Sequence, residues 1–212
     1  MARNGVEATD VADVAAAAGI GVDAMRCLFE SKEALLDALA DESVRGNGDA
    51  IEAAVAVVRD PAEVVAGSVR RTVRLGDADA VHAWLLRNDD RYAEALTEDL
   101  ASRLLRSLSR GVWVGRFLIS SVLVQHRVIQ GAVLAVLRAT PQGQLPEDAA
   151  EELATGILQM LGLPWEEAAA IATRPLPRPR AAAPADEHCW PGTRPWGRRR
   201  PVPPSVCRPR RR

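Results

Sequence analysis

Two strings near the N-terminus decide the fold: DVAAAAGI at residues 13–20 and FESKEALL at residues 29–36. Apolar residues in the first string recur at helical spacing, and Gly19 is the kind of residue that ends a helix. A second short helix is predicted from about Val22 to Phe29. Two short helices joined by a glycine-containing turn are the parts of a helix-turn-helix, whose second helix presents its outer residues to the DNA major groove.

The ends of these helices carry capping signals. Asp10 and Asp13 have the spacing of a capping box, with carboxylates where the helix dipole favours negative charge. Ser31 is placed to cap a third helix, which we expect to end at Gly46 and Gly48.

The chain from there to residue 173 alternates helical stretches with Pro and Gly breakers and has no strand-like alternation of useful length. Ala and Leu, two of the strongest helix formers, are abundant in it. We therefore predict an all-α protein. The expected helices of this part cover residues 49–59, 62–75, 77–88, 91–110, 118–139, 147–161 and 165–172.

The last 39 residues differ from everything before them. Residues 174–212 hold 11 Arg, two acidic residues and ten of the 14 prolines, so this segment is strongly basic although the whole chain has a net charge of −1. Proline blocks helix continuation, and we expect a disordered basic tail. Such a tail can bind nucleic acid without sequence preference. A passive tail and out-of-frame translation of GC-rich sequence are the two alternatives.

The predicted organisation is a helix-turn-helix head at 1–46, a helical ligand-binding and dimerisation domain at 47–173, and the tail at 174–212. No uninterrupted apolar run approaches the ~18–20 residues that a membrane helix needs, and the N-terminus has no leader-like pattern. We expect a cytoplasmic protein without a membrane partner. The three cysteines are scattered, and no set of residues indicates a metal, a cofactor or a nucleophile with its base, so an enzyme is not predicted.

Residues 5–40 resemble the DNA-binding head of TetR-family transcriptional regulators. The match is carried by residues 13–20, by Phe29 at the end of the second helix, and by the SKEAL string that opens the third. The resemblance implies a homodimer that binds a double-stranded DNA operator. It also implies a helical domain whose small-molecule effector changes the spacing of the two heads and thereby releases DNA.

Carried over residue by residue, the resemblance assigns the recognition helix and its phosphate contact. Lys32 matches the phosphate-contacting lysine of the family, its alternative being a solvated surface charge. Arg26 could contact a phosphate or a guanine edge, or instead pair with Glu30 on the same helix. The DNA-binding residues are predicted to be Gly21, Val22, Asp23, Ala24, Arg26, Cys27 and Lys32.

The same segment departs from the family pattern at its polar positions. Gly21, Ala24 and Arg26 stand where the family usually has serine, threonine and tyrosine. Residues 1–45 carry four basic and nine acidic residues, a net charge of −5 that disfavours DNA. Only about eight residues precede the first predicted helix, where the family has a bracing helix, so we expect a start codon upstream. A second function therefore stays open: a dimeric helical effector-binding protein whose head no longer binds DNA.

The remaining candidates lie on the later helices. Large or polar residues on otherwise aliphatic helices are candidates for an effector cavity, although each could be a core or surface residue. These are His82, Trp84, Trp113, Arg116, Phe117 and His126. Two apolar stripes on the last long helices fit either the subunit core or a dimer seam, and the resemblance favours the seam. They consist of Val122, Ile129, Val133, Leu153, Ile157 and Met160.

Overall fold

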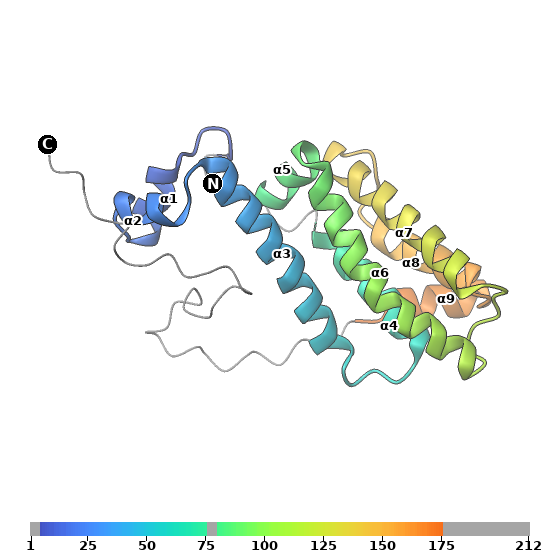
Figure 1. Ribbon diagram of the computed structural model, residues 1–212. Coiled ribbons are helices and arrows are strands. Elements are labelled where there is room, and N and C mark those ends of the chain that lie inside the picture. The colour runs from blue at the N-terminus through green and yellow to red at the C-terminus, as the bar shows by residue number, and fades with distance from the viewer. Residues whose placement is uncertain (1–4, 76–79, 176–212) are drawn as a thin grey trace, which may run out of the picture.

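The computed structural model describes residues 5–75 and 80–175, and this part of the chain is helical with short connections (Figure 1). In chain order, the elements are α1 (Val11–Ala18), α2 (Val22–Leu28), α3 (Lys32–Val55), α4 (Pro61–Leu75), α5 (Ala80–Asn88), α6 (Asp90–Trp113), α7 (Val122–Ala139), the 3-10 turn η1 (Thr140–Gln142), α8 (Ala149–Met160) and α9 (Trp165–Ala172). The predicted fold class is confirmed, with most boundaries within a few residues of the expected ones.

One predicted boundary is wrong: α3 does not end at Gly46 and Gly48 but continues as a single helix of 24 residues. Gly48 faces α6 so closely that a Cβ there would lie 2.3 Å from Arg103 Nη2 and 2.7 Å from Asp99 Oδ2. The glycine is therefore a packing residue inside the helix. The boundary expected after residue 46 lies within α3, and the helix predicted over 49–59 is its second half.

A second glycine was misinterpreted for the same reason. α6 was expected to end before Gly111, yet it extends to Trp113. A Cβ at Gly111 would lie 2.0 Å from Cδ2 of Phe117, because that ring folds back onto the helix. The predicted start of α5 at residue 77 lies outside the described residues.

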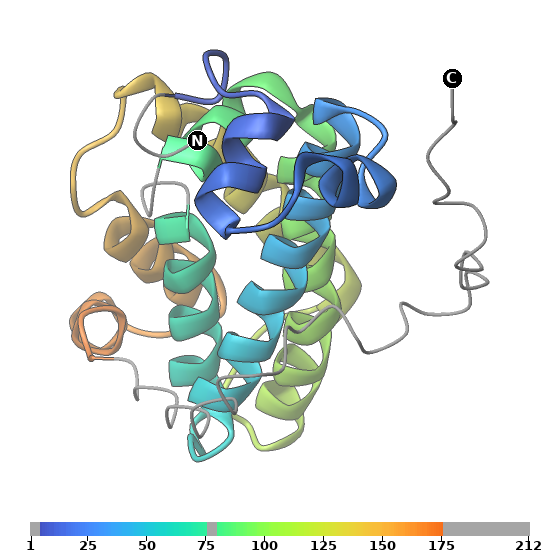
Figure 2. The same cartoon turned by 90° about the vertical axis from the view of Figure 1, so that its left-hand side faces the viewer.

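The head, residues 5–40, lies at the N-terminal end of α3, and the body, residues 41–175, packs around the remainder of that helix (Figure 1). With the long helices seen from the side, α4 runs beside α3 (Figure 2). α4 contacts α3, α6, α8 and α9, and ten of its 15 residues are buried. The body is therefore built around α4.

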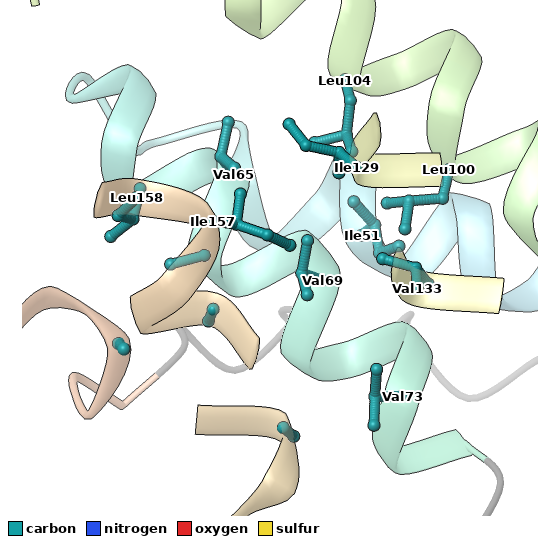
Figure 3. Close-up of a cluster of buried hydrophobic side chains, with 14 of the residues drawn as sticks. Ile51, Val65, Val69, Val73, Leu100, Leu104, Ile129, Val133, Ile157 and Leu158 are labelled. Atoms are coloured by element: carbon teal, nitrogen blue, oxygen red, sulfur yellow. The ribbon is translucent and has the colours of Figure 1, made fainter. Parts of the chain in front are cut away.

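The body has a continuous aliphatic core (Figure 3). Val65 and Val69 of α4 meet Ile157 of α8 on one side, while Leu100 of α6 and Ile129 of α7 fill the other. None of the hydrophobic side chains buried in the head below Ala40 belongs to this cluster: Val6, Ala15, Met25, Leu35 and Leu36. The head therefore has a small core of its own.

α7 and its extension are the most apolar helical segment. Val122–Gln142 is long and apolar enough to cross a membrane by length and composition, which the search for uninterrupted apolar runs did not reveal. One such helix is weak evidence, and 17% of its apolar window is buried inside the protein. Ile129, Val133 and Leu137 on this segment are wholly buried against the body.

The last described residues fold back on α4. Nη1 of the buried Arg70 donates to the carbonyl oxygen of Arg174 at 2.6 Å, and Arg70 Nε donates to Glu151 at 2.9 Å. Arg174 also pairs with Glu63. The body thus ends in an ordered ion-pair network, and the remainder of the predicted tail, 176–212, lies outside the described residues.

Candidate DNA-binding head and effector domain

The turn between α1 and α2 has the geometry expected of a helix-turn-helix. Asp10 and Asp13 form the predicted capping box, with side chain to backbone distances of 2.9 and 3.0 Å. Gly19 ends α1 in the left-handed region at φ 68°, which glycine adopts without strain. The next N–H, that of Ile20, donates to the Ala15 carbonyl at 3.0 Å and directs the chain into α2.

α2 turns one side into the head and the other to solvent. Met25 is buried and Val22 is half-buried. Gly21 caps the helix without a side-chain hydrogen bond, so its first N–H groups are available to another acceptor. The other predicted DNA-facing residues are exposed: Asp23, Ala24, Arg26 and Cys27. Arg26 and Glu30 do not form the ion pair that was the alternative for this arginine.

The start of α3 lies beside the recognition helix and carries the second predicted contact. Ser31 accepts from the Ala34 N–H at 3.1 Å and caps the helix. The Lys32 ammonium donates to the carbonyl oxygen of Glu7 at 3.0 Å, which holds it near this helix end. The backbone N–H of Glu33 and the hydroxyl of Ser31 lower the pKa of Glu33. A carboxylate therefore already occupies this helix N-terminus, where a DNA phosphate would also bind.

The segment before α1 contributes to the head in a way that the sequence did not reveal. Val6 and Thr9 are 2% and 3% exposed, and the Thr9 hydroxyl donates to the Gly5 carbonyl at 2.7 Å. Val11, Val14 and Phe29, on the elements that follow, are half-buried. A single valine in a polar segment carries no periodicity, so pattern reasoning could not identify this cover.

Glu7 joins the head to the body. Its carboxylate accepts from the indole N–H of Trp84 on α5 at 3.0 Å, while its backbone carbonyl accepts from Lys32. One residue therefore contacts both the candidate phosphate-binding lysine and the body. Trp84, predicted to line a cavity, lies at this junction instead.

The other effector candidates are dispersed over the body. Trp113 is 86% exposed, while Phe117 is 2% exposed and packs on Gly111. His126 hydrogen-bonds the Ala101 carbonyl across the α6–α7 contact at 2.9 Å. His82 differs, because its Nε2 lies 2.8 Å from the hydroxyl of Ser43 on α3, and both residues are half-buried. Of these candidates, the structure brings only His82 to a polar cluster between helices.

Arg116 has a structural explanation. It binds Asp60 through two contacts of 3.0 Å and Glu167 at 2.7 Å, joining the start of α4 to α9. These hydrogen bonds raise the pKa of the Arg116 guanidinium. Burial raises the pKa of Asp60, but hydrogen bonds from Arg116 and the Ala62 N–H outweigh burial and bring it below its ordinary value.

A groove lies between α3 and the start of α6. Its volume is about 340 Å3, within the range of small-molecule sites. The apolar wall consists of Ala40, Val44, Tyr92 and Ala95, and the polar rim of Asp37, Asp41, Asp89 and Arg91.

The predicted dimer residues divide into two groups. Ile129, Val133 and Ile157 are 0% exposed in the body's own core, so a second subunit cannot touch them. Val122 and Leu153 are half-buried, and Met160 is 40% exposed. Three of the six predicted residues are therefore core residues of one subunit, and for Val122, Leu153 and Met160 the dimer seam stays a prediction. The exposed residues of α7 are Leu123, Val124, Arg127, Val128, Gly131 and Ala135, so its outward side is apolar apart from Arg127.

Comparison with known proteins agrees with this architecture. Residues 1–39 match the family model for bacterial regulatory proteins of the tetR family, and residues 60–174 match that of the tetracyclin repressor-like C-terminal domain. The chain belongs to the TetR family of transcriptional regulators. None of the curated proteins matches it.

Solved structures have a similar fold. RolR (NCGL1110) without ligand is 29% identical, with a TM-score of 0.66 over 84% of this chain and 94% of that one. RolR in complex with resorcinol is 30% identical, with a TM-score of 0.65 over 84% and 90%. A TetR/AcrR-family regulator from Thermobifida fusca YX-ER1 is 23% identical with a TM-score of 0.55 over 74% and 87%, which shows the fold alone.

Proposed function

We propose that this TetR-family regulator is a cytoplasmic, non-enzymatic repressor that binds its operator as a homodimer and releases it when a small molecule enters the body. The observation that carries the proposal is the exposed face of α2 beside Lys32. Two cationic side chains, Arg26 and Lys32, and the open N-terminus of α2 lie at the same end of the molecule. Cations and helix N-terminal N–H groups are what bind phosphates in protein–DNA complexes.

The outward face of α7 supports the homodimer. Val124 and Val128 are 61% and 45% exposed, and with Gly131 and Ala135 they recur at helical spacing. A Cβ at Gly131 or at Gly156 of α8 would meet no atom within 4 Å, so helices of a second subunit could approach closely there. Exposed contiguous apolar surface marks an interaction site. This face also accounts for the apolar character of α7.

Light scattering tests the dimer. We expect Val128→Glu to convert the protein to a monomer, because each copy would bury an uncompensated charge. Ala53→Glu, a matched change at an exposed α3 position, should leave the dimer intact. A Val128→Glu protein that remains dimeric contradicts this interface.

RolR, which binds resorcinol in its complex, supports a small hydroxylated effector for this chain as well. α3 suits transmission of the signal, because it is one uninterrupted helix from Lys32 to the middle of the body. An effector releases DNA only if it binds more tightly to the conformation of the body in which the distance between the two heads no longer matches the operator.

The acidic head favours the second function, an effector-binding dimer that does not bind DNA. Asp23 is exposed on α2, and Glu33 occupies the N-terminus of α3. Both place negative charge where phosphates would lie, which weakens DNA binding.

A gel shift with the DNA upstream of the protein's own gene separates the two functions. Under the repressor proposal, binding occurs at low salt, and Arg26→Ala and Lys32→Ala each weaken it about tenfold or more because a phosphate contact is lost. Arg59→Ala removes an exposed charge from the α3–α4 connection and serves as the matched control. A folded dimer without binding at any salt concentration supports the second function.

A further inference from the structure

We propose that the amide of Asn47, in the interior between α3 and α4, is the anchor for a small neutral ligand that carries a hydroxyl group. The inference rests on the proposed effector function and names the residue and the ligand chemistry. It starts from a side chain whose hydrogen bonding is incomplete among the described residues.

Asn47 is 4% exposed, and its Nδ2 donates to the hydroxyl of Thr72, which is 0% exposed, at 3.2 Å. Its Oδ1 is buried and has no hydrogen-bond partner in the described part of the chain. If the amide is turned over, Nδ2 instead is left without a partner. Buried polar atoms are nearly always paired in native proteins, so an open position here indicates that something else binds.

The surroundings of Asn47 define the chemistry of that partner. Ile51 follows Asn47 by one turn of α3, Val73 follows Thr72 in α4, and both belong to the aliphatic core. Neither Asn47 nor Thr72 carries a formal charge. Burying an ion beside them would be costly, which selects a neutral ligand. A hydroxyl group both donates and accepts a hydrogen bond, so it satisfies the amide in either orientation.

The groove between α3 and the start of α6 lies one turn before this position on α3, and its lining ends at Val44. Val44 lines the groove and precedes Asn47 by three residues, so the two share one face of α3. Tyr92 forms another part of the groove wall, and its hydroxyl lies 2.7 Å from Ser43 Oγ. Ser43 also lies 2.8 Å from His82 of α5. This hydrogen-bonded chain joins α3, α5 and α6 one turn before Asn47.

A ligand at Asn47 would act directly on the helix that supports the head. α3 carries Ser43, Asn47 and Lys32 without a break. Fifteen residues separate Asn47 from Lys32, which at ~1.5 Å per residue is roughly 22 Å of continuous helix. A displacement of α3 from α4 at Asn47 therefore moves the head as a rigid arm.

Calorimetry with phenol and toluene tests the site, because the two probes differ by a hydroxyl in place of a methyl group. We expect phenol to bind the full-length protein at least about tenfold more tightly than toluene, the value of one hydrogen bond. Asn47→Leu should remove this preference, while Thr97→Val should preserve it, since the buried Thr97 hydroxyl bonds carbonyl oxygens of its own helix.

A second measurement needs only the wild-type protein and covers the case in which Asn47→Leu does not fold. NMR should detect contacts between the phenol ring protons and both the Asn47 side-chain amide and the Thr72 methyl group. Three outcomes would each overturn the proposal. The first is no binding of phenol up to about 10 mM, the range of a weak fragment's affinity. The others are equal affinity for phenol and toluene, and bound phenol without these contacts. All these measurements omit DNA, so their failure is distinct from failure of operator binding.

Discussion

The head and the body both bury apolar side chains, but the two cores differ greatly in size. Five hydrophobic side chains are buried in the head before Ala40, whereas the body has a continuous core that extends from α3 to α9. The head is joined to the body by α3, by the Glu7–Trp84 hydrogen bond and by the exposed Arg91–Asp37 ion pair. From this difference we infer that the head is the less stable part and can reorient while the body stays folded.

The largest expected effects concern the two cores. Ile157→Ala should destabilise the whole protein by about 2–5 kcal/mol, because it leaves a cavity in the body's core. Urea unfolding measures it as a shift of the transition midpoint.

Met25→Ala is the matched variant in the core of the head. We expect faster amide hydrogen exchange in residues 5–40 and a nearly unchanged body transition. A single cooperative loss of head and body in both variants would show that the two cores are not separate.

Glycines inside the long helices give the next effect. Gly111→Ala should destabilise the body by about 1–3 kcal/mol, since its Cβ would overlap the Phe117 ring. Gly46→Ala is the control: it meets no atom within 4 Å, and alanine should stabilise α3 by about 1 kcal/mol. Equal effects of the two changes on the thermal midpoint would exclude the packing role of Gly111.

The Arg116–Asp60 pair gives a smaller, pH-dependent effect. The folded-state pKa of Asp60 lies below its unfolded value, which is about 3.9. The pair's contribution to the free energy of unfolding is therefore present in full above the unfolded pKa and is lost as pH falls through the folded pKa. Both side chains are about a quarter exposed, and we expect Arg116→Met to cost about 1 kcal/mol near neutral pH. Urea unfolding from pH 7 to 2 should show this difference shrinking only below about pH 4. A difference that grows at low pH contradicts the assignment.

The smallest effect on stability should come from the junction itself. Trp84→Phe keeps the ring but removes the N–H that Glu7 accepts, at a cost of less than about 1 kcal/mol for an exposed hydrogen bond. Its consequence should be dynamic: hydrogen exchange should increase at residues 5–9 and not in the body. Unchanged exchange at Glu7 and its neighbours would show that the Glu7–Trp84 hydrogen bond does not couple the two regions.

Local patterns predicted the helices and the head well because they report local physics. The capping box at Asp10, the left-handed Gly19 and the cap at Ser31 depend on residues a few positions apart, and all three are present. Gly48 and Gly111 were misinterpreted because each is required by a side chain distant in the chain or beyond the helix end. Sequence spacing does not contain that information.

The site was less predictable for a related reason. Exposure of the recognition-helix residues followed from helical periodicity, whereas the pairing of Asn47 with Thr72 and of Trp84 with Glu7 joins separate helices. For α7, periodicity identified one apolar stripe, and only the packing against α6 shows that Ile129 and Val133 of this stripe lie in the subunit core.

The account's central claim is that the small head still binds DNA through Arg26 and Lys32. Fluorescence anisotropy with the upstream DNA, repeated over a range of salt concentrations, tests it most directly. The slope of log K against log salt concentration should be reduced by about 2 in the Lys32→Ala dimer, one phosphate contact for each subunit, and unchanged in Arg59→Ala. Equal slopes for the wild-type protein and Lys32→Ala would contradict the claim.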